Sequence, residues 1–122
     1  MKYKHIIWDW NGTLLNDLTL CVDLLNLSLE KRKLPAMTED KYRKKFLFPI
    51  KTFYESIGFD FSKEDFTIAN DEFHQGFEQK FKKLALQPYA QDTIARFQKL
   101  GITQSILSAT VQSRLNEQVD FF

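Results

Sequence analysis

The sequence predicts an α/β fold with two short parallel strands, which lie before and after a long helical insertion in the chain. Residues 5–8 form a short run of β-branched and aromatic residues with the composition of a buried strand, and residues 102–108 are interpreted as a second buried strand. Between them, residues 16–84 show the apolar spacing of helices and contain no convincing strand. The order strand, helical insertion, helix, strand, helix is typical of an α/β core.

Composition narrows the class of protein. The chain has 122 residues, enough for one domain or less, and its 43% hydrophobic content suits a globular protein. A net charge of +1 with interspersed acids and bases predicts no nucleic-acid partner. No segment approaches the roughly 20 apolar residues of a membrane helix, so no membrane association is expected. The single cysteine, Cys21, excludes an intramolecular disulfide and favours a cytoplasmic location.

The first predicted strand, 5–8, ends in a turn that concentrates polar groups. Asp9 follows the strand directly, and Asn11-Gly12 is a dipeptide that readily breaks a strand. A carboxylate at the C-terminal end of a parallel strand lies where open α/β sheets bind ligands. The amides of such a turn can meet an anion. The simpler alternative is that Asp9 only begins the turn, as aspartate often does.

Four helices are expected in the insertion, at about 16–32, 38–45, 50–57 and 62–84. Pro35 and Gly58 are expected to end the first and third helices. Phe48-Pro49 is expected to interrupt the helical structure between the second and the third. Ser62 is expected to open the fourth helix through a capping box. Four phenylalanines of the fourth helix are expected to form the core of the insertion: Phe66, Phe73, Phe77 and Phe81.

After the insertion, a helix from about 90 to 100 leads into the second strand, which ends at Ser108. If the two strands are parallel neighbours, the Ser108 hydroxyl lies near Asp9. The amides of Ala109 and Thr110, at the start of the following helix, would add donors for a phosphate group. Ser108 or Thr110 could instead serve only as a helix cap.

Two of these segments carry a family resemblance. The string DWNGTL at 9–14 resembles motif I of the haloacid dehalogenase-like (HAD) superfamily, Asp-x-Asp-Gly-Thr followed by Leu or Val, with Asn11 in place of the second Asp. The string ILSAT at 106–110 resembles motif II, and the order of elements is similar to that of phosphoglycolate phosphatase-like members. The resemblance implies a partial HAD-like Rossmannoid core and an all-helical cap. The core would comprise 1–15 and 86–122, and the cap 16–85.

The resemblance also implies a function. It predicts a Mg²⁺-dependent phosphatase that acts on a small phosphorylated metabolite through an aspartyl-phosphate. Asp9 would be the nucleophile and a Mg²⁺ ligand, and Asn11 would occupy the second catalytic position and bind Mg²⁺ through its backbone carbonyl. The implied phosphate-binding residues are Trp10, Gly12, Thr13, Ser108 and Ala109. In the cap, Phe48 and Pro49 lie where many members carry a substrate-contacting loop.

Two departures from the family pattern keep other functions open. Asn11 cannot exchange the proton that the second aspartate transfers, and general acid–base catalysis is commonly worth about 10²–10⁴ in rate. The motif III lysine and motif IV acids have no counterpart before Phe122, so we expect the chain to be the N-terminal portion of a longer protein. The alternatives are a catalytically impaired phosphate-binding or interaction remnant, and a structural fragment completed by another chain. Self-association, or pairing with a missing C-terminal portion, is expected.

Overall fold

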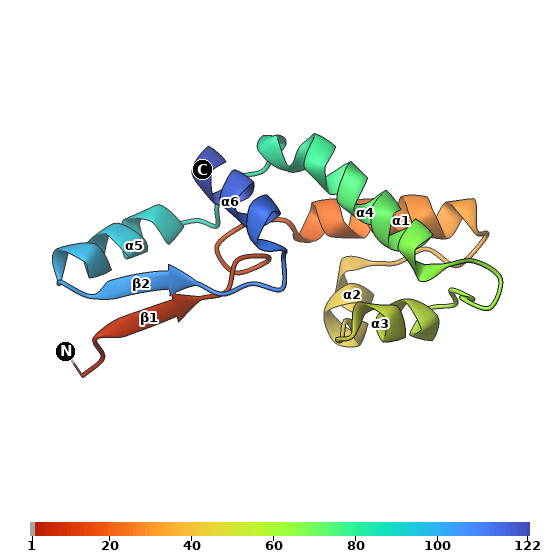
Figure 1. Ribbon diagram of the computed structural model, residues 1–122, viewed down its shortest axis with the longest axis horizontal. Coiled ribbons are helices and arrows are strands. Elements are labelled where there is room, and N and C mark those ends of the chain that lie inside the picture. Colours follow the sequence, from red (N-terminus) through yellow and green to blue (C-terminus); the bar gives the residue numbers. More distant parts are fainter. Residues whose placement is uncertain (1) are drawn as a thin grey trace. The chain divides into compact units, whose positions relative to one another are not determined.

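The computed structural model describes residues 2–122 and divides them into two compact units (Figure 1). The core unit combines the residues up to Asp17 with Phe81–Phe122, and the helical unit is Leu18–Lys80. The predicted α/β class is confirmed, with one parallel sheet of two strands in the core unit. Within residues 2–122, none of the helices has the length and apolar character needed to cross a bilayer.

The sheet of the core unit pairs β1 (His5–Trp8) with β2 (Thr103–Ile106) in parallel. The register pairs the last residue of β1 with the last residue of β2, so the chain leaves the sheet at the same edge after each strand. The amide of Leu107 extends the ladder by donating to the carbonyl oxygen of Trp8 at 2.9 Å. The loops that follow β1 and β2 therefore begin side by side.

One face of this sheet is packed against α5 (Ala90–Lys99). The Trp8 indole donates to the side-chain oxygen of Gln104 at 2.8 Å, and the Gln104 amide donates to the carbonyl oxygen of Ile94 at 3.0 Å. The rings of Trp8 and Phe97 lie 6.4 Å apart between centroids. These contacts connect β1, β2 and α5, so the sheet and the helix form two packed layers.

The opposite face of the sheet corrects one expectation. Both strands were expected to be buried, yet exposed and half-buried residues alternate along each of them. Ile7 is 63% exposed and Leu107 is 71% exposed. The physical reason is that side chains alternate between the two faces of a strand, and the packing of α5 covers one face.

The helical unit contains four α-helices and no strand, as predicted for this segment. They are α1 (Leu18–Lys31), α2 (Glu39–Lys45), α3 (Ile50–Ser56) and α4 (Phe66–Lys80). The two longer helices, α1 and α4, lie against each other.

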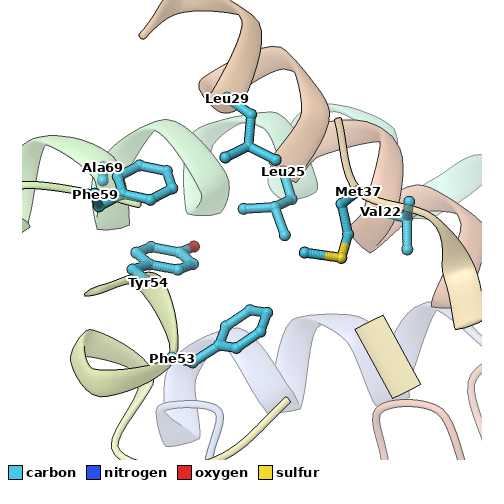
Figure 2. Close-up of a cluster of buried hydrophobic side chains, with 8 residues drawn as sticks. All are labelled: Val22, Leu25, Leu29, Met37, Phe53, Tyr54, Phe59 and Ala69. Atoms are coloured by element: carbon cyan, nitrogen blue, oxygen red, sulfur yellow. The ribbon is translucent and has the colours of Figure 1, made fainter. Parts of the chain in front are cut away.

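Aromatic and aliphatic side chains from α1, α3 and α4, and from the segments before α2 and α4, meet in one buried cluster (Figure 2). Leu29 and Phe53 are each 1% exposed, and burying a side chain of this size stabilises the fold by about 1.5–3 kcal/mol. The rings of Tyr54 and Phe59 stack with their centroids 4.8 Å apart. The members of the cluster are Val22, Leu25, Leu29, Met37, Phe53, Tyr54, Phe59 and Ala69.

The ends of two helices differ in detail from the expected ones. The first helix ends at Lys31, one residue before the expected end at about 32, but it is stopped at Lys33 and not by Pro35. Lys33 adopts a left-handed conformation (φ 57°), and the Leu34 amide bonds back to the Leu29 carbonyl at 2.9 Å. The fourth helix begins at Phe66 rather than Ser62.

The start of α4 shows why the expected capping box does not form. The carboxylate of Asp65 accepts the amide of Thr67 at 2.9 Å, which satisfies a donor of the first helical turn. The Ser62 hydroxyl instead donates to Asp60 in the preceding loop. An acid nearer to the helix therefore takes the capping role.

A charged cluster joins α1 to α4 and to the loop before α4. The Arg32 guanidinium donates to Glu64 at 2.9 Å and to Glu72 at 2.9 Å, while the Ser28 hydroxyl donates to Glu72 at 2.7 Å. These contacts, with those from Arg32 foremost, lower the pKa of Glu72 to about 2. The cluster stabilises the packing of the two long helices.

Phe81 lies outside the core of the helical unit, contrary to expectation. It belongs to a short 3₁₀ helix, η1 (Phe81–Lys83), in the core unit, and is 1% exposed. Its ring contacts Phe121 at 5.9 Å and Phe122 at 6.5 Å, at the end of α6 (Gln112–Phe121). Helix α4 ends at Lys80, and the spacing of the four phenylalanines gave no indication of this end because Phe81 continues the helical pattern.

Candidate functional site

The loop after β1 is a tight turn built on the carbonyl oxygen of Trp10. This oxygen accepts the amides of Thr13 at 3.2 Å and Leu15 at 3.0 Å, and Gly12 turns the chain with φ 76°. That conformation favours glycine because a Cβ would strain the backbone. The turn keeps the residues after Asp9 close to the end of the strand.

Asp9 lies exposed at the C-terminal end of β1, and its carboxylate is held by its own loop. Oδ1 accepts the amide of Trp10 at 2.9 Å, and Oδ2 accepts the hydroxyl of Thr13 at 3.1 Å. Hydrogen bonds to both oxygens orient the carboxylate while its exposed side remains accessible. A carboxylate held in this way can act as a nucleophile or as a metal ligand.

The side chain of Asn11 connects three parts of the core unit. Its amide nitrogen donates to Asp17 at 2.9 Å. Its side-chain oxygen accepts the hydroxyl of Thr110 at 2.9 Å and that of Ser108 at 3.4 Å. Asn11 therefore joins the loop after β1 to the loop after β2.

The loop after β2 departs from the expected geometry. The Ser108 hydroxyl accepts the Thr110 amide at 3.1 Å, which closes a local turn. Helix α6 begins only at Gln112, with Val111 at its N-cap, so neither Ser108 nor Thr110 caps it. The amides of Ala109 and Thr110 therefore precede the first turn of the helix, and the Thr110 amide is bonded to the Ser108 side chain.

The backbone donors expected to bind phosphate are engaged within the first loop. The Trp10 amide donates to Asp9, the Gly12 amide to the Leu15 carbonyl at 3.0 Å, and the Thr13 amide to the Trp10 carbonyl. The Trp10 ring is buried, with its indole nitrogen donating to Gln118 at 2.9 Å. Phosphate binding through these amides therefore requires exchange of internal hydrogen bonds.

Sequence reasoning missed two residues that hold this site together. Asp17, the residue before α1, is 3% exposed and accepts the side-chain amide of Asn11. Gln87 donates its amide to the Leu14 carbonyl at 2.7 Å and its side chain to the Gly12 carbonyl at 3.3 Å. Both roles depend on contacts between segments that are separate in the sequence, and no local sequence pattern marks them.

Comparison with known proteins now identifies the family. Residues 6–122 match the family described as haloacid dehalogenase-like hydrolase. The chain belongs to the haloacid dehalogenase-like hydrolase family. The resemblance carried by the DWNGTL and ILSAT strings is thereby confirmed at the level of the family. No curated protein matches the sequence significantly.

Solved structures share the fold of this haloacid dehalogenase-like chain. A predicted phosphoglycolate phosphatase from Haemophilus somnus 129pt aligns with a TM-score of 0.79 and 18% identity over 100% of this chain and 58% of its own. A candidate haloacid dehalogenase-like hydrolase from Bacteroides fragilis aligns with a TM-score of 0.82 and 17% identity, over 98% of this chain and 57% of its own. The chain thus spans under two thirds of the length of both structures.

The donor set around Asp9 is consistent in kind with the magnesium ion used by haloacid dehalogenase-like enzymes. Residues 2–122 contain no group of three or more His, Cys, Asp or Glu side chains able to hold a metal. Mg²⁺, however, is usually bound by one or two carboxylates together with waters and substrate phosphate oxygens. The Asp9 carboxylate and the Asn11 carbonyl are hard oxygen donors of this kind.

The two residues expected in the cap belong to the helical unit. Phe48 is 64% exposed, and its ring contacts that of Phe46 at 5.2 Å between centroids. Pro49 is the N-cap residue of α3. An exposed aromatic side chain beside a helix start can contact a ligand, and the assignment of Phe48 and Pro49 to substrate binding stays a prediction.

Proposed function

We propose that this chain supplies the nucleophile and cap of a Mg²⁺-dependent phosphatase that hydrolyses a small phosphorylated metabolite through an aspartyl-phosphate. The observation that carries the proposal is the position of Asp9. Its exposed carboxylate stands at the end of β1, oriented by Thr13 at 3.1 Å and by the Trp10 amide at 2.9 Å. Membership of the hydrolase family supports hydrolysis as the reaction.

In the proposed reaction, Asp9 Oδ attacks the phosphorus atom of the substrate, and the bond from phosphorus to the leaving oxygen breaks. The amides of Gly12 and Thr13 exchange their internal hydrogen bonds for the phosphoryl oxygens, which the Ser108 hydroxyl and the Ala109 amide also hold. Asp9 and the Asn11 carbonyl would hold Mg²⁺, which when bound neutralises charge between the anionic carboxylate and the anionic phosphate. Phe48 and Pro49 would contact the organic part of the substrate.

Asn11 favours a second candidate function, a phosphate-binding protein with little or no turnover. Its amide donates to Asp17 and its oxygen accepts from Thr110, so both polar ends of the side chain are occupied. An amide has no proton to give to the leaving oxygen and cannot activate water as a base. Capture of a phosphoryl group would then be faster than its release.

The cellular location proposed for this activity is the cytoplasm. Cys21, the single cysteine, lies buried in α1 and forms no disulfide, which supports a reducing compartment.

Phosphoryl capture tests the proposal without requiring turnover. The 122-residue chain is incubated with acetyl phosphate and Mg²⁺, and its mass is measured after rapid acid quenching. We expect the mass of one phosphoryl group to be added and peptide mapping to locate it on Asp9. Asp9→Asn should remove the addition, whereas the matched control Asp120→Asn, an exposed acid on α6, should retain it. Equal labelling of the Asp9→Asn variant would contradict the assignment.

A further inference from the structure

The orientation of the Asn11 side chain is determined by what faces it. On one side stands the carboxylate of Asp17, 2.9 Å from the Asn11 nitrogen. An ionised carboxylate only accepts hydrogen bonds, so the NH₂ group of Asn11 must point towards it. The Asn11 oxygen is thereby directed to the opposite side, where it accepts from the Thr110 hydroxyl at 2.9 Å.

Asp17 in turn depends on such a donor. It is 3% exposed, and a buried carboxylate is costly unless it is hydrogen-bonded. It also lies against the turn that carries the site, since a Cβ built on Gly12 would stand 3.9 Å from Asp17 Oδ1. Asp17 therefore contacts the loop after β1 through Asn11 and lies beside Gly12.

We propose that Asp17 is a positioning residue that selects an amide at position 11 and, through that amide, fixes the loop after β1 against the loop after β2. The proposal deepens the proposed function, on which it rests for the importance of position 11. It explains how Asn replaces the second aspartate of motif I: position 11 and position 17 form a matched donor and acceptor.

The proposal has a specific consequence for restoring that aspartate. In Asn11→Asp, two carboxylates would face each other at the present distance of 2.9 Å with no donor between them. The Thr110 and Ser108 hydroxyls could still donate to the new carboxylate. The defect would thus be confined to the contact with Asp17, and Asp17→Asn in the same chain would repair it by supplying an amide from the other side.

A four-variant cycle of equilibrium unfolding tests this pairing. We expect Asn11→Asp to raise the unfolding equilibrium constant by about tenfold or more, because the buried Asp17 carboxylate would face a second carboxylate in place of the Asn11 amide. The Asp17→Asn single variant should change it less, since the new side-chain oxygen still accepts from Asn11. The double variant should return to within about threefold of the parent. The control Asn16→Asp places the same charge on an exposed neighbour and should change little.

A spectroscopic readout separates positioning from general stabilisation. In ¹H–¹⁵N spectra, the side-chain NH₂ signals of Asn11 should be shifted by the Asp17 contact and should move towards solvent-exposed values in Asp17→Ala. Unchanged Asn11 signals in that variant would overturn the proposal, as would a double variant as unstable as Asn11→Asp. Neither measurement involves phosphoryl transfer, so the pairing and the proposed function can fail separately.

Discussion

The hydroxyl of Thr110 donates a hydrogen bond to the side-chain oxygen of Asn11 at 2.9 Å, across 99 residues of sequence. The two residues lie in the loops that follow β1 and β2, which leave the sheet at the same edge. Ser108 reaches the same oxygen at 3.4 Å. The side chain of Asn11 thus joins the two loops that the proposed phosphate site requires.

Replacing Thr110 by valine should weaken this link while keeping the shape of the side chain. A hydrogen bond of this kind contributes about 0.5–1.5 kcal/mol, so we expect Thr110→Val to lower the free energy of unfolding by about 1 kcal/mol. The control Thr52→Val, at an exposed position on α3, should change it by less than about half of that. Denaturant unfolding measures both, and equal effects would show that the Thr110 hydroxyl makes no special contribution.

Two glycines separate backbone strain from function. Gly12 and Gly101 have nearly the same φ, 76° and 75°, and an added Cβ would meet nothing closer than 3.9 Å at Gly12 and nothing within 4 Å at Gly101. Each glycine-to-alanine change should therefore destabilise the fold by about 1–2 kcal/mol through the backbone alone. Only Gly12→Ala should also reduce phosphoryl capture by Asp9. Loss of capture in Gly101→Ala as well would mean that strain anywhere in the core unit disables the site.

The charged cluster of the helical unit predicts a loss of stability in acid. The Arg32 contacts lower the pKa of Glu72 from 4.5 to about 2, so between these values the unfolded chain binds a proton that the folded chain does not. The stabilisation, about 1–3 kcal/mol, is complete above pH 4.5 and is lost as the pH falls towards 2.

The Glu72→Gln variant isolates this contribution. It should be less stable than the parent at pH 7 and should show a shallower decline between pH 4.5 and 2. Asp71→Asn, at an exposed position of the same helix, should keep the parental profile. Thermal melts over this pH range provide the measurement. Parallel profiles for the parent and Glu72→Gln would contradict the role assigned to Glu72.

The exposed face of the sheet predicts concentration-dependent self-association. Ile7 is 63% exposed and Leu107 is 71% exposed, and large apolar side chains grouped on one face favour association. Ile7→Thr combined with Leu107→Thr should shift the population towards monomer in multi-angle light scattering. The control Leu27→Thr, which changes a 57% exposed leucine on α1, should leave it unchanged. A parent chain that remains monomeric at all concentrations would refute this expectation.

The fold was predictable because its signals are local. The apolar run at 5–8 followed by Asp9 and Asn11-Gly12 predicts a strand and a turn without knowledge of the rest of the chain. Helical spacing likewise predicted all four helices of the insertion. Boundaries were less predictable: Lys33 ends the first helix in a conformation usually taken by glycine, and so carries no recognisable stop signal.

The site was only partly predictable. Asp9 and Ser108 follow from strand ends, and the parallel register brings their loops to one edge. The role of Asp17 depends on its burial against Asn11, and the competition of Ser108 for the Thr110 amide depends on the loop conformation. Neither property has a periodic or compositional signature, because each arises from contacts between segments.

The central claim is that the two loops form one phosphoryl site centred on Asp9. A titration with beryllium fluoride and Mg²⁺ tests it most directly, because this anion mimics a phosphoryl group on a carboxylate. Amide signals of residues 9–13 and 108–110 are followed in ¹H–¹⁵N spectra. Shifts in both loops with one binding curve, absent in Asp9→Asn, are the predicted result. Shifts confined to one loop, or persisting in Asp9→Asn, would contradict the account.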